Sequence, residues 1–139
     1  MEIHSTILNN GRCSLIIESN FSKILEHQYI SYEYRHQTFF AKNFAIFKLS
    51  KLSIFDQISL FNSTKLILGL HGAGFANIIF CKKKTKIYEI LKKKDSKRNA
   101  FKTLSNHSSL KHTKIIINKY KKIDGYDQLI FDKKYFDLF

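Results

Sequence analysis

The sequence predicts a single α/β domain built around a mostly parallel sheet. Its 139 residues are enough for one domain with a real hydrophobic core. Short apolar runs alternate along the chain with segments of helix-like spacing, as in successive strand, helix, strand units. The run Leu66–Leu70 is almost uninterruptedly apolar, which suits a parallel strand that is covered by helices on both faces. We therefore treat residues 1–139 as one domain.

The predicted elements follow one another in a regular order. Ser53 favours a helix start, because its hydroxyl can accept the amide of Asp56 and the Asp56 carboxylate suits the first turn. Ile54, Ile58 and Phe61 then recur at helical spacing and are expected to face the sheet as core residues. The expected strands are Ser14–Glu18, 44–49, Leu66–Leu70, 87–91 and 111–118, and the expected helices are 21–29, 53–61, 75–80, one from Ser96 or Asn99 through Leu104, and 127–139.

The most informative stretch for function is the loop that follows the run Leu66–Leu70. This loop reads His71-Gly72-Ala73-Gly74, and helix-like spacing begins directly after it. Its glycines remove side chains where the backbone turns and where a ligand could approach the main chain. The first amides of a helix lack internal partners and carry partial positive charge, so a bound anion can supply the partners. His71 could donate a further hydrogen bond to a phosphate oxygen. We therefore predict a phosphate site over this loop.

A carboxylate is expected near the same loop. The apolar segment 87–91 completes a strand, turn, helix, strand unit and brings Glu89 toward the crevice, where it could accept hydrogen bonds from ribose hydroxyls. The spacing Gly69-x-x-Gly72-x-Gly74 is not that of the dinucleotide fingerprint, and no Gly-Lys-Ser/Thr follows as in a Walker loop. On the residues alone, glycines that only turn the chain beside a loop histidine are an equally good interpretation.

A longer series of motifs resembles a known family. The motif S-x-x-x-Q-I-x-L-F at residues 53–61 is followed by HGAG and then by Asn77, Phe80 and Glu89. This combination resembles the C-terminal domain of glycosyltransferase family 61, which includes plant xylan xylosyltransferases, an animal O-linked N-acetylglucosamine transferase and bacterial capsular polysaccharide proteins. The resemblance implies a Rossmann-like three-layer domain, like the C-terminal half of a GT-B glycosyltransferase, with residues 44–91 as its nucleotide-binding core.

The resemblance also implies an activity. A glycosyltransferase of this family would move a hexosyl or pentosyl group from a nucleotide sugar, expected to be a UDP-sugar, to a glycan or protein-linked acceptor. The pyrophosphate would lie over residues 72–74, with His71 and Asn77 as side-chain donors and Glu89 near the ribose or base. The sequence identifies no catalytic base for the acceptor hydroxyl. It implies no metal and no cofactor besides the donor.

The chain differs from the family pattern at several places. Leu70 stands where the family has a proline before the histidine, and residues 82–84 are lysines where it has a proline-glycine turn. The family's arginine-rich stretch after an upstream strand has no counterpart in residues 20–28. GT-B enzymes also take their acceptor contacts largely from their other half, which a second chain could supply. Residues 1–13 would then be the remnant of an upstream region, and an inactive fragment of a glycosyltransferase is the alternative.

Basic residues are concentrated after the predicted phosphate loop. Residues 82–122 contain fifteen of the 24 basic residues and two of the 11 acidic ones, which accounts for the whole net charge of +13. Such a field would attract a nucleotide sugar, an anionic polysaccharide, an acidic membrane or nucleic acid, although no recognisable nucleic-acid module is present. A non-enzymatic basic module for polyanions is therefore a second functional hypothesis. The lysine-rich coding of an AT-rich genome would explain the same excess without any partner.

Other polar groups receive no chemical role from the sequence. Cys13 and Cys81 are far apart, no Cys/His cluster has the spacing of a zinc site, and Cys81 is expected to be a small buried hydrophobe. His107 and His112 are interpreted as loop residues. No apolar run reaches the roughly 18 residues of a transmembrane helix, and the N-terminus does not resemble a signal peptide. The expected location is the cytoplasm for a bacterial protein, and the Golgi or ER lumen for a piece of a eukaryotic enzyme.

Overall fold

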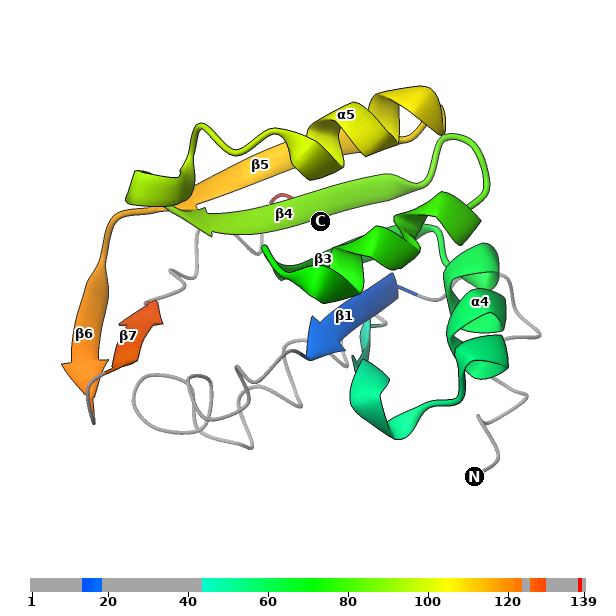
Figure 1. Cartoon of the computed structure of the whole chain (residues 1–139), viewed down its shortest axis with the longest axis horizontal. Coiled ribbons are helices and arrows are strands. Elements are labelled where there is room, and N and C mark those ends of the chain that lie inside the picture. The colour runs from blue at the N-terminus through cyan, green and yellow to red at the C-terminus, as the bar shows by residue number, and fades with distance from the viewer. Residues whose placement is uncertain (1–13, 19–43, 124–125, 130–137, 139) are drawn as a thin grey trace.

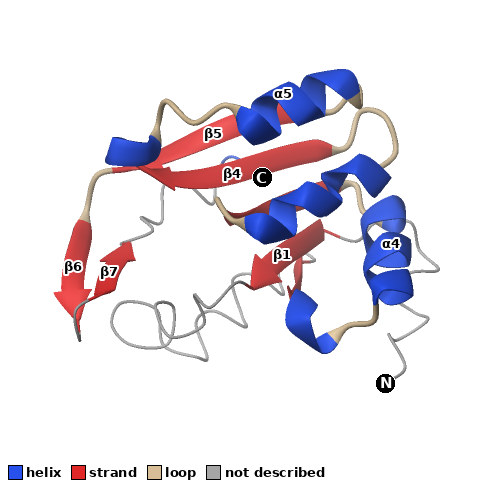
Figure 2. Cartoon of the chain, viewed as in Figure 1, coloured by secondary structure: helices blue, strands red, loops and turns tan. Residues whose placement is uncertain are grey.

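A parallel sheet organises the chain. The computed structural model describes residues 14–18, 44–123, 126–129 and 138 and shows an α/β domain (Figure 1; Figure 2). Its five-stranded sheet is parallel at every strand pair. The predicted α/β class with a parallel sheet is confirmed. The strands of this sheet are β1 (Ser14–Glu18), β2 (Phe44–Lys48), β3 (Leu66–Leu70), β4 (Lys86–Lys92) and β5 (Lys111–Ile117).

The strand order places one loop at a special position. The order is β2-β1-β3-β4-β5, which is one of the two common orders of doubly wound α/β proteins. The chain reverses its direction across the sheet between β1 and β3, because β2 lies on one side of β1 and the later strands lie on the other. Ligands of such sheets bind outside the carboxyl ends of the strands at this reversal. The loop that follows β3 begins at this point.

Both faces of the sheet are shielded at β3. Ile67 and Leu68 are consecutive, so their side chains point to opposite faces, and they are 0% and 3% exposed. This pattern is the one expected of a parallel strand that is covered on both sides. A three-layer arrangement would need helices on each face. The helix predicted at residues 21–29 lies outside the described residues, so the second helical layer stays a prediction.

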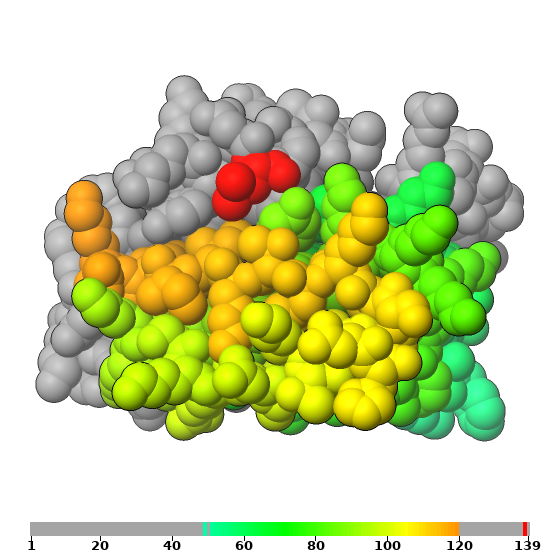
Figure 3. Space-filling view, turned by 90° about the horizontal axis from the view of Figure 1, so that it is seen from above, coloured from blue at the N-terminus to red at the C-terminus, as the bar shows by residue number. Residues whose placement is uncertain are grey.

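The described helices form one layer over the sheet (Figure 1). α4 (Ile54–Ser63) contacts η2 (Ala73–Phe80), and η2 contacts α5 (Ala100–His107), which packs on β5. Figure 3 shows α5 in yellow beside β5 in orange. None of the helices in the described part of the chain has the length and apolar character to cross a membrane. Two short 3₁₀ turns, η1 (Leu49–Lys51) and η3 (Lys93–Asp95), follow β2 and β4.

A compact core lies between this helical layer and the sheet. Burying one large aliphatic or aromatic side chain contributes about 1.5–3 kcal/mol to folding, so eight such residues anchor the helices firmly. The structure thereby holds the start of η2 in a fixed place relative to β3 and β4. The buried residues of this cluster are Leu49, Leu60, Phe61, Ile67, Phe75, Ile78, Ile87 and Leu110.

The start of α4 matches the sequence prediction, and its packing differs from it. Ser53 is the N-cap, with its Oγ accepting the amide of Asp56 at 3.1 Å. Leu60 and Phe61 are buried, whereas Ile54 is 54% exposed. The prediction that Ile54 faces the sheet is therefore wrong. Ile54 lies in the first turn of α4, whereas the helix packs on the core through its last turns. The apolar spacing therefore continues to the start of the helix, but the contact with the core does not.

The end of the chain forms strands where the sequence analysis expected a helix. β6 (Tyr120–Ile123) and β7 (Tyr126–Leu129) pair antiparallel, with Tyr120 opposite Leu129. A helix over 127–139 is therefore wrong at residues 127–129, because these residues bond to a neighbouring strand and not to their own next turn. The rest of that predicted helix lies mostly outside the described residues.

Candidate functional site

The predicted phosphate loop lies at the carboxyl end of β3. His71 N donates to Ile90 O at 2.8 Å, which ties the start of the loop to β4. η2 begins at Ala73, two residues earlier than the sequence predicted, and it is a 3₁₀ helix in which Phe75 N donates to Gly72 O at 3.0 Å. The amides of the three residues before Phe75 precede this first helical bond. They have no backbone acceptor in the part of the chain that the structure describes.

Gly72 has room for a side chain within the protein itself. Its φ of 176° and ψ of 174° are extended backbone that other residues also adopt. A Cβ at this position would meet Leu70 O at 3.8 Å, which is an ordinary van der Waals contact. Neither the backbone conformation nor the packing of the described residues therefore requires glycine at this position.

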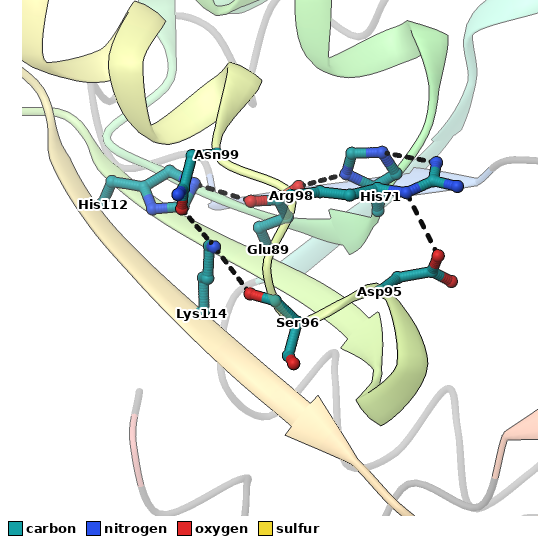
Figure 4. Close-up of polar contacts among 8 residues, drawn as sticks. All are labelled: His71, Glu89, Asp95, Ser96, Arg98, Asn99, His112 and Lys114. Atoms are coloured by element: carbon teal, nitrogen blue, oxygen red, sulfur yellow. Dashed lines mark hydrogen bonds and ion pairs between the residues drawn. The ribbon is translucent and has the colours of Figure 1, made fainter.

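A buried carboxylate lies between two histidines at the base of the loop (Figure 4). Glu89 is in β4, beside Gly69 of β3, and its side chain is 1% exposed. His71 Nδ1 is hydrogen-bonded to Glu89 Oε1. His112 Nε2, on β5, lies 2.9 Å from Glu89 Oε2. That distance is typical of an ion pair. Glu89 thus contacts a histidine with each of its oxygens.

The two histidine contacts keep Glu89 ionised. Burial disfavours the charged carboxylate and would raise its pKa, whereas hydrogen bonding and charge from His112 and His71 lower it, and the net result is a pKa below the ordinary value. An ionised carboxylate can only accept hydrogen bonds, so the shared proton belongs to His71 Nδ1. The other ring nitrogen of His71, Nε2, is then the one that is turned toward the loop from 95 to 99.

That loop brings a cation to His71. Arg98 Nη1 lies 3.4 Å from His71 Nε2, while Arg98 Nε pairs with Asp95 Oδ1 at 3.1 Å. Lys114 Nζ, from β5, donates to Ser96 O at 2.9 Å and to Asn99 Oδ1 at 2.7 Å. These bonds hold the segment between η3 and α5 against the site (Figure 4). An exposed guanidinium therefore lies beside the histidine that follows β3.

Asn77 has a partner elsewhere. Its Nδ2 donates to Gln57 Oε1 at 2.8 Å, and Gln57 Nε2 in turn donates to Leu49 O at 3.1 Å and Leu52 O at 3.2 Å. This chain of bonds joins η2 to α4 and to the turn before α4. The structure brings together His71, the loop and Glu89, but among the described contacts it does not bring Asn77 to them.

Sequence reasoning missed His112, Lys114 and Arg98. The expected strand 111–118 is confirmed as β5 and contains His112, so the interpretation of His112 as a loop residue is wrong; its side chain is 2% exposed. His107 is not in a loop either, since it ends α5 and its Nδ1 contacts Thr103 O at 2.9 Å. The sequence did contain a sign of two of these residues. His112 and Lys114 are two positions apart in the predicted strand, so they lie on the same face of it.

The described residues show neither a cluster that could bind a metal ion nor a reactive thiol. No group of three or more His, Cys, Asp or Glu residues within the described ranges is arranged to hold a metal ion. Cys81 follows η2 and packs against the core cluster, and burial raises the pKa of its thiol to about 12. A thiol of this kind is protonated at neutral pH, so it is not a nucleophile there.

Comparison with known proteins places this geometry in a family. A family model described as Glycosyltransferase 61 matches residues 18–88, about half of the chain. No curated protein is similar enough to count as a match. The matched region runs from the end of β1 into β4 and contains α4, the loop after β3 and η2. It ends one residue before the carboxylate that holds His71. The chain therefore belongs to glycosyltransferase family 61.

Proposed function

We propose that this chain binds the diphosphate of a nucleotide-sugar donor at loop 71–74 and supplies the donor site of a glycosyltransferase. The observation that carries the proposal is the row of three amides, those of Gly72, Ala73 and Gly74, without a backbone acceptor in the described part of the chain. They lie at the start of a helix, where peptide dipoles favour negative charge. Phosphate oxygens can accept hydrogen bonds from such amides.

The absence of side chains in the loop supports the same proposal. At Gly72 the protein has room for a Cβ, so its own packing does not explain the glycine. A ligand that approaches the main chain closely would explain it, because a Cβ would then occupy the space of a phosphate oxygen. Glycine is in this view a requirement of binding and not of folding.

His71 would be the side-chain donor to the diphosphate. Glu89 accepts the proton of His71 Nδ1, so Nε2 can donate to a phosphate oxygen only in the charged form of His71, in which both ring nitrogens carry a proton. Because Glu89 is buried, we propose that it acts on the donor through His71. A direct contact with the ribose, as the family resemblance implies, would require His71 to move aside. His112, on the neighbouring strand β5, contacts the other oxygen of the Glu89 carboxylate and so helps to hold Glu89 in place.

Arg98 would add a positive charge to the site. Its guanidinium lies next to His71 Nε2 and is exposed. Negative charge develops on the diphosphate as the sugar leaves, and preorganised donors in a fixed scaffold stabilise such charge. The loop amides, His71 and Arg98 are arranged to do this together. The base that takes the proton of the acceptor hydroxyl is not assigned.

The fold supports a Rossmann-like donor half of a GT-B enzyme. The proposed site lies at the carboxyl end of β3, next to the reversal of strand order, which is where doubly wound sheets bind nucleotides. A glycan or glycoprotein acceptor would then be held largely by another part of a longer protein or by a second chain. The transferred group would be a hexosyl or pentosyl unit, with a UDP-sugar as the expected donor.

A comparison of uridine, UMP and UDP tests the diphosphate site directly. Hydrogen bonds to a charged group contribute about 1.5–3 kcal/mol each, so UDP should bind at least about tenfold more tightly than UMP. Gly74→Val should remove this preference, because its side chain would block the amides. Ala76→Val adds bulk to an exposed position of η2 outside the loop and serves as the control. Equal affinity for the three ligands would show that the loop does not hold phosphate.

A further inference from the structure

A cluster of lysines lies on the edge of the sheet opposite the proposed donor site. It occupies the amino-terminal ends of β3, β4 and β5, at the right-hand side of the sheet in Figure 1, whereas the loop after β3 lies at the carboxyl ends. All of its side chains are exposed. We call this surface the lysine edge, and its members are Lys65, Lys82, Lys83, Lys84, Lys86 and Lys111.

Backbone hydrogen bonds fix the lysine edge as one surface. Lys86 N donates to Lys65 O at 2.9 Å, and Lys84 N donates to Ser109 O at 2.8 Å. Lys111 N donates to Thr85 O at 2.9 Å. Three segments that are distant in sequence are therefore held side by side at their backbones. The backbone that carries these lysine side chains is therefore held in place by hydrogen bonds.

The positive charge of this edge is not neutralised within the described part of the chain. None of the six lysines forms an ion pair there, and the three acidic groups between residues 49 and 119 are engaged elsewhere. Glu89 contacts the two histidines, Asp95 pairs with Arg98, and Asp56 accepts from Ser53. Like charges gathered on one surface repel one another, and an anionic surface that faces them relieves this repulsion.

The chemistry of the edge favours a lipid surface over other polyanions. Residues 63–65, 81–86 and 108–111, which form its turns, contain no arginine and no aromatic residue. Arginine supplies the planar, two-pronged contacts that specific phosphate and carboxylate recognition uses, and aromatic rings supply the platforms on which nucleic-acid bases stack. Lysine acts as a point charge, which suits a diffuse field of negative headgroups. Ile79, near the end of η2, is 51% exposed and adds an apolar side chain three residues before Lys82.

We propose that the lysine edge docks this chain on a membrane surface rich in anionic phospholipids, with Ile79 at headgroup level. In this orientation the strands lead away from the membrane. β4 has seven residues and therefore spans about 23 Å, so the donor loop stays open to the aqueous phase. This inference is independent of what the donor loop binds.

Vesicle flotation tests the proposal with the full chain. The probes are vesicles of phosphatidylcholine alone and vesicles with one part in four of phosphatidylglycerol. Each lysine near an anionic surface strengthens binding about fivefold, so the variant Lys82→Gln, Lys83→Gln, Lys84→Asn should bind the anionic vesicles on the order of a hundredfold more weakly. Asparagine is used at position 84 because the φ of 69° at Lys84 is one that asparagine tolerates.

A second triple variant is the matched control. Lys93→Gln, Lys97→Gln, Lys102→Gln removes the same charge from exposed positions outside the edge and should change vesicle binding by less than about fivefold. The pair Lys65→Gln, Lys111→Gln provides an independent test of the edge should the first variant misfold by circular dichroism. Nucleotide-sugar affinity should be the same in all edge variants.

Three results would overturn the proposal. One is that the edge variant and the control variant weaken vesicle binding equally, which would show that binding depends on the net charge of the chain and not on the lysine edge. Another is an absence of binding to anionic vesicles at roughly 0.1 M salt. The third is binding to duplex DNA or an anionic polysaccharide, at the same salt, that exceeds binding to the vesicles. A loss of donor binding with intact vesicle binding would instead contradict the proposed function and leave the lysine edge standing.

Discussion

Gly72→Ala separates the roles of the loop in folding and in binding. A Cβ at this position would meet Leu70 O at 3.8 Å, an ordinary contact, and the extended backbone is one that alanine adopts. Replacing glycine by alanine at a compatible site stabilises a protein by about 0.4–1 kcal/mol, because the unfolded chain loses conformational freedom. We therefore expect the free energy of unfolding to stay the same or to rise slightly.

The same substitution should weaken donor binding. If the added methyl group displaces a phosphate oxygen from one of the loop amides, one charge-assisted hydrogen bond is lost, or about 1.5–3 kcal/mol. This corresponds to an affinity for UDP that is about tenfold to a hundredfold lower. Urea unfolding and calorimetric titration of the same preparation measure the two quantities.

Ala76→Gly is the control for this experiment. It makes the opposite change at an exposed position of η2 beyond the loop and should lower stability by about 0.5–1 kcal/mol without changing affinity. The reasoning is refuted if Gly72→Ala lowers stability by more than about 1 kcal/mol, since packing would then explain the glycine. It is also refuted if the variant binds UDP as tightly as the unmodified chain.

Three further predictions concern side chains that are buried or partly buried. The lowered pKa of Glu89 means that its ionised form stabilises the fold above the ordinary value of 4.5 and that this contribution disappears as the pH falls through the folded pKa. Acid unfolding of Glu89→Gln should therefore depend less steeply on pH, and identical slopes would contradict the contact geometry. With a pKa of about 12, the Cys81 thiol is ionised in about one molecule in 10⁴ at pH 8. In a Cys13→Ser chain, a thiol reagent should therefore react with Cys81 roughly three orders of magnitude faster after unfolding than before it. Rapid labelling of the folded chain would argue against the burial of Cys81. Asn77→Ala should cost about 1 kcal/mol of stability and be non-additive with Gln57→Ala, whereas a loss of donor affinity at unchanged stability would make Asn77 a ligand.

Local patterns were enough to predict the framework of the sheet. The strands Ser14–Glu18 and Leu66–Leu70 have the boundaries that their apolar runs indicate, and Ser53 caps its helix as its spacing to Asp56 predicts. Each of these features depends on residues within a few positions of one another. The α/β class followed from them, because alternating strands and helices favour a parallel sheet.

The polar contacts of the site could not be predicted in the same way. His112 meets Glu89 only because β4 and β5 are paired in a particular register, and 23 positions separate the two residues. Ile54 has the spacing of a core residue, but its place in the first turn of α4 leaves it exposed. Such outcomes depend on which elements pack together, and this information is not local.

The strands at the end of the chain could have been predicted from the sequence. Asp124-Gly125 is a dipeptide typical of two-residue hairpin turns. It lies between β6 and β7, which pair antiparallel. At residues 127–129 the strand pairing that this dipeptide favours is therefore observed in place of the predicted helix.

A calorimetric titration with a panel of nucleotide sugars tests the central claim most directly. The chain should bind one class of nucleotide diphosphate sugar at a single site, with heat that disappears in Gly74→Val and persists in Ala76→Val. No heat with any member of the panel, or binding that Gly74→Val leaves unchanged, would contradict the assignment of the loop after β3 as the donor diphosphate site.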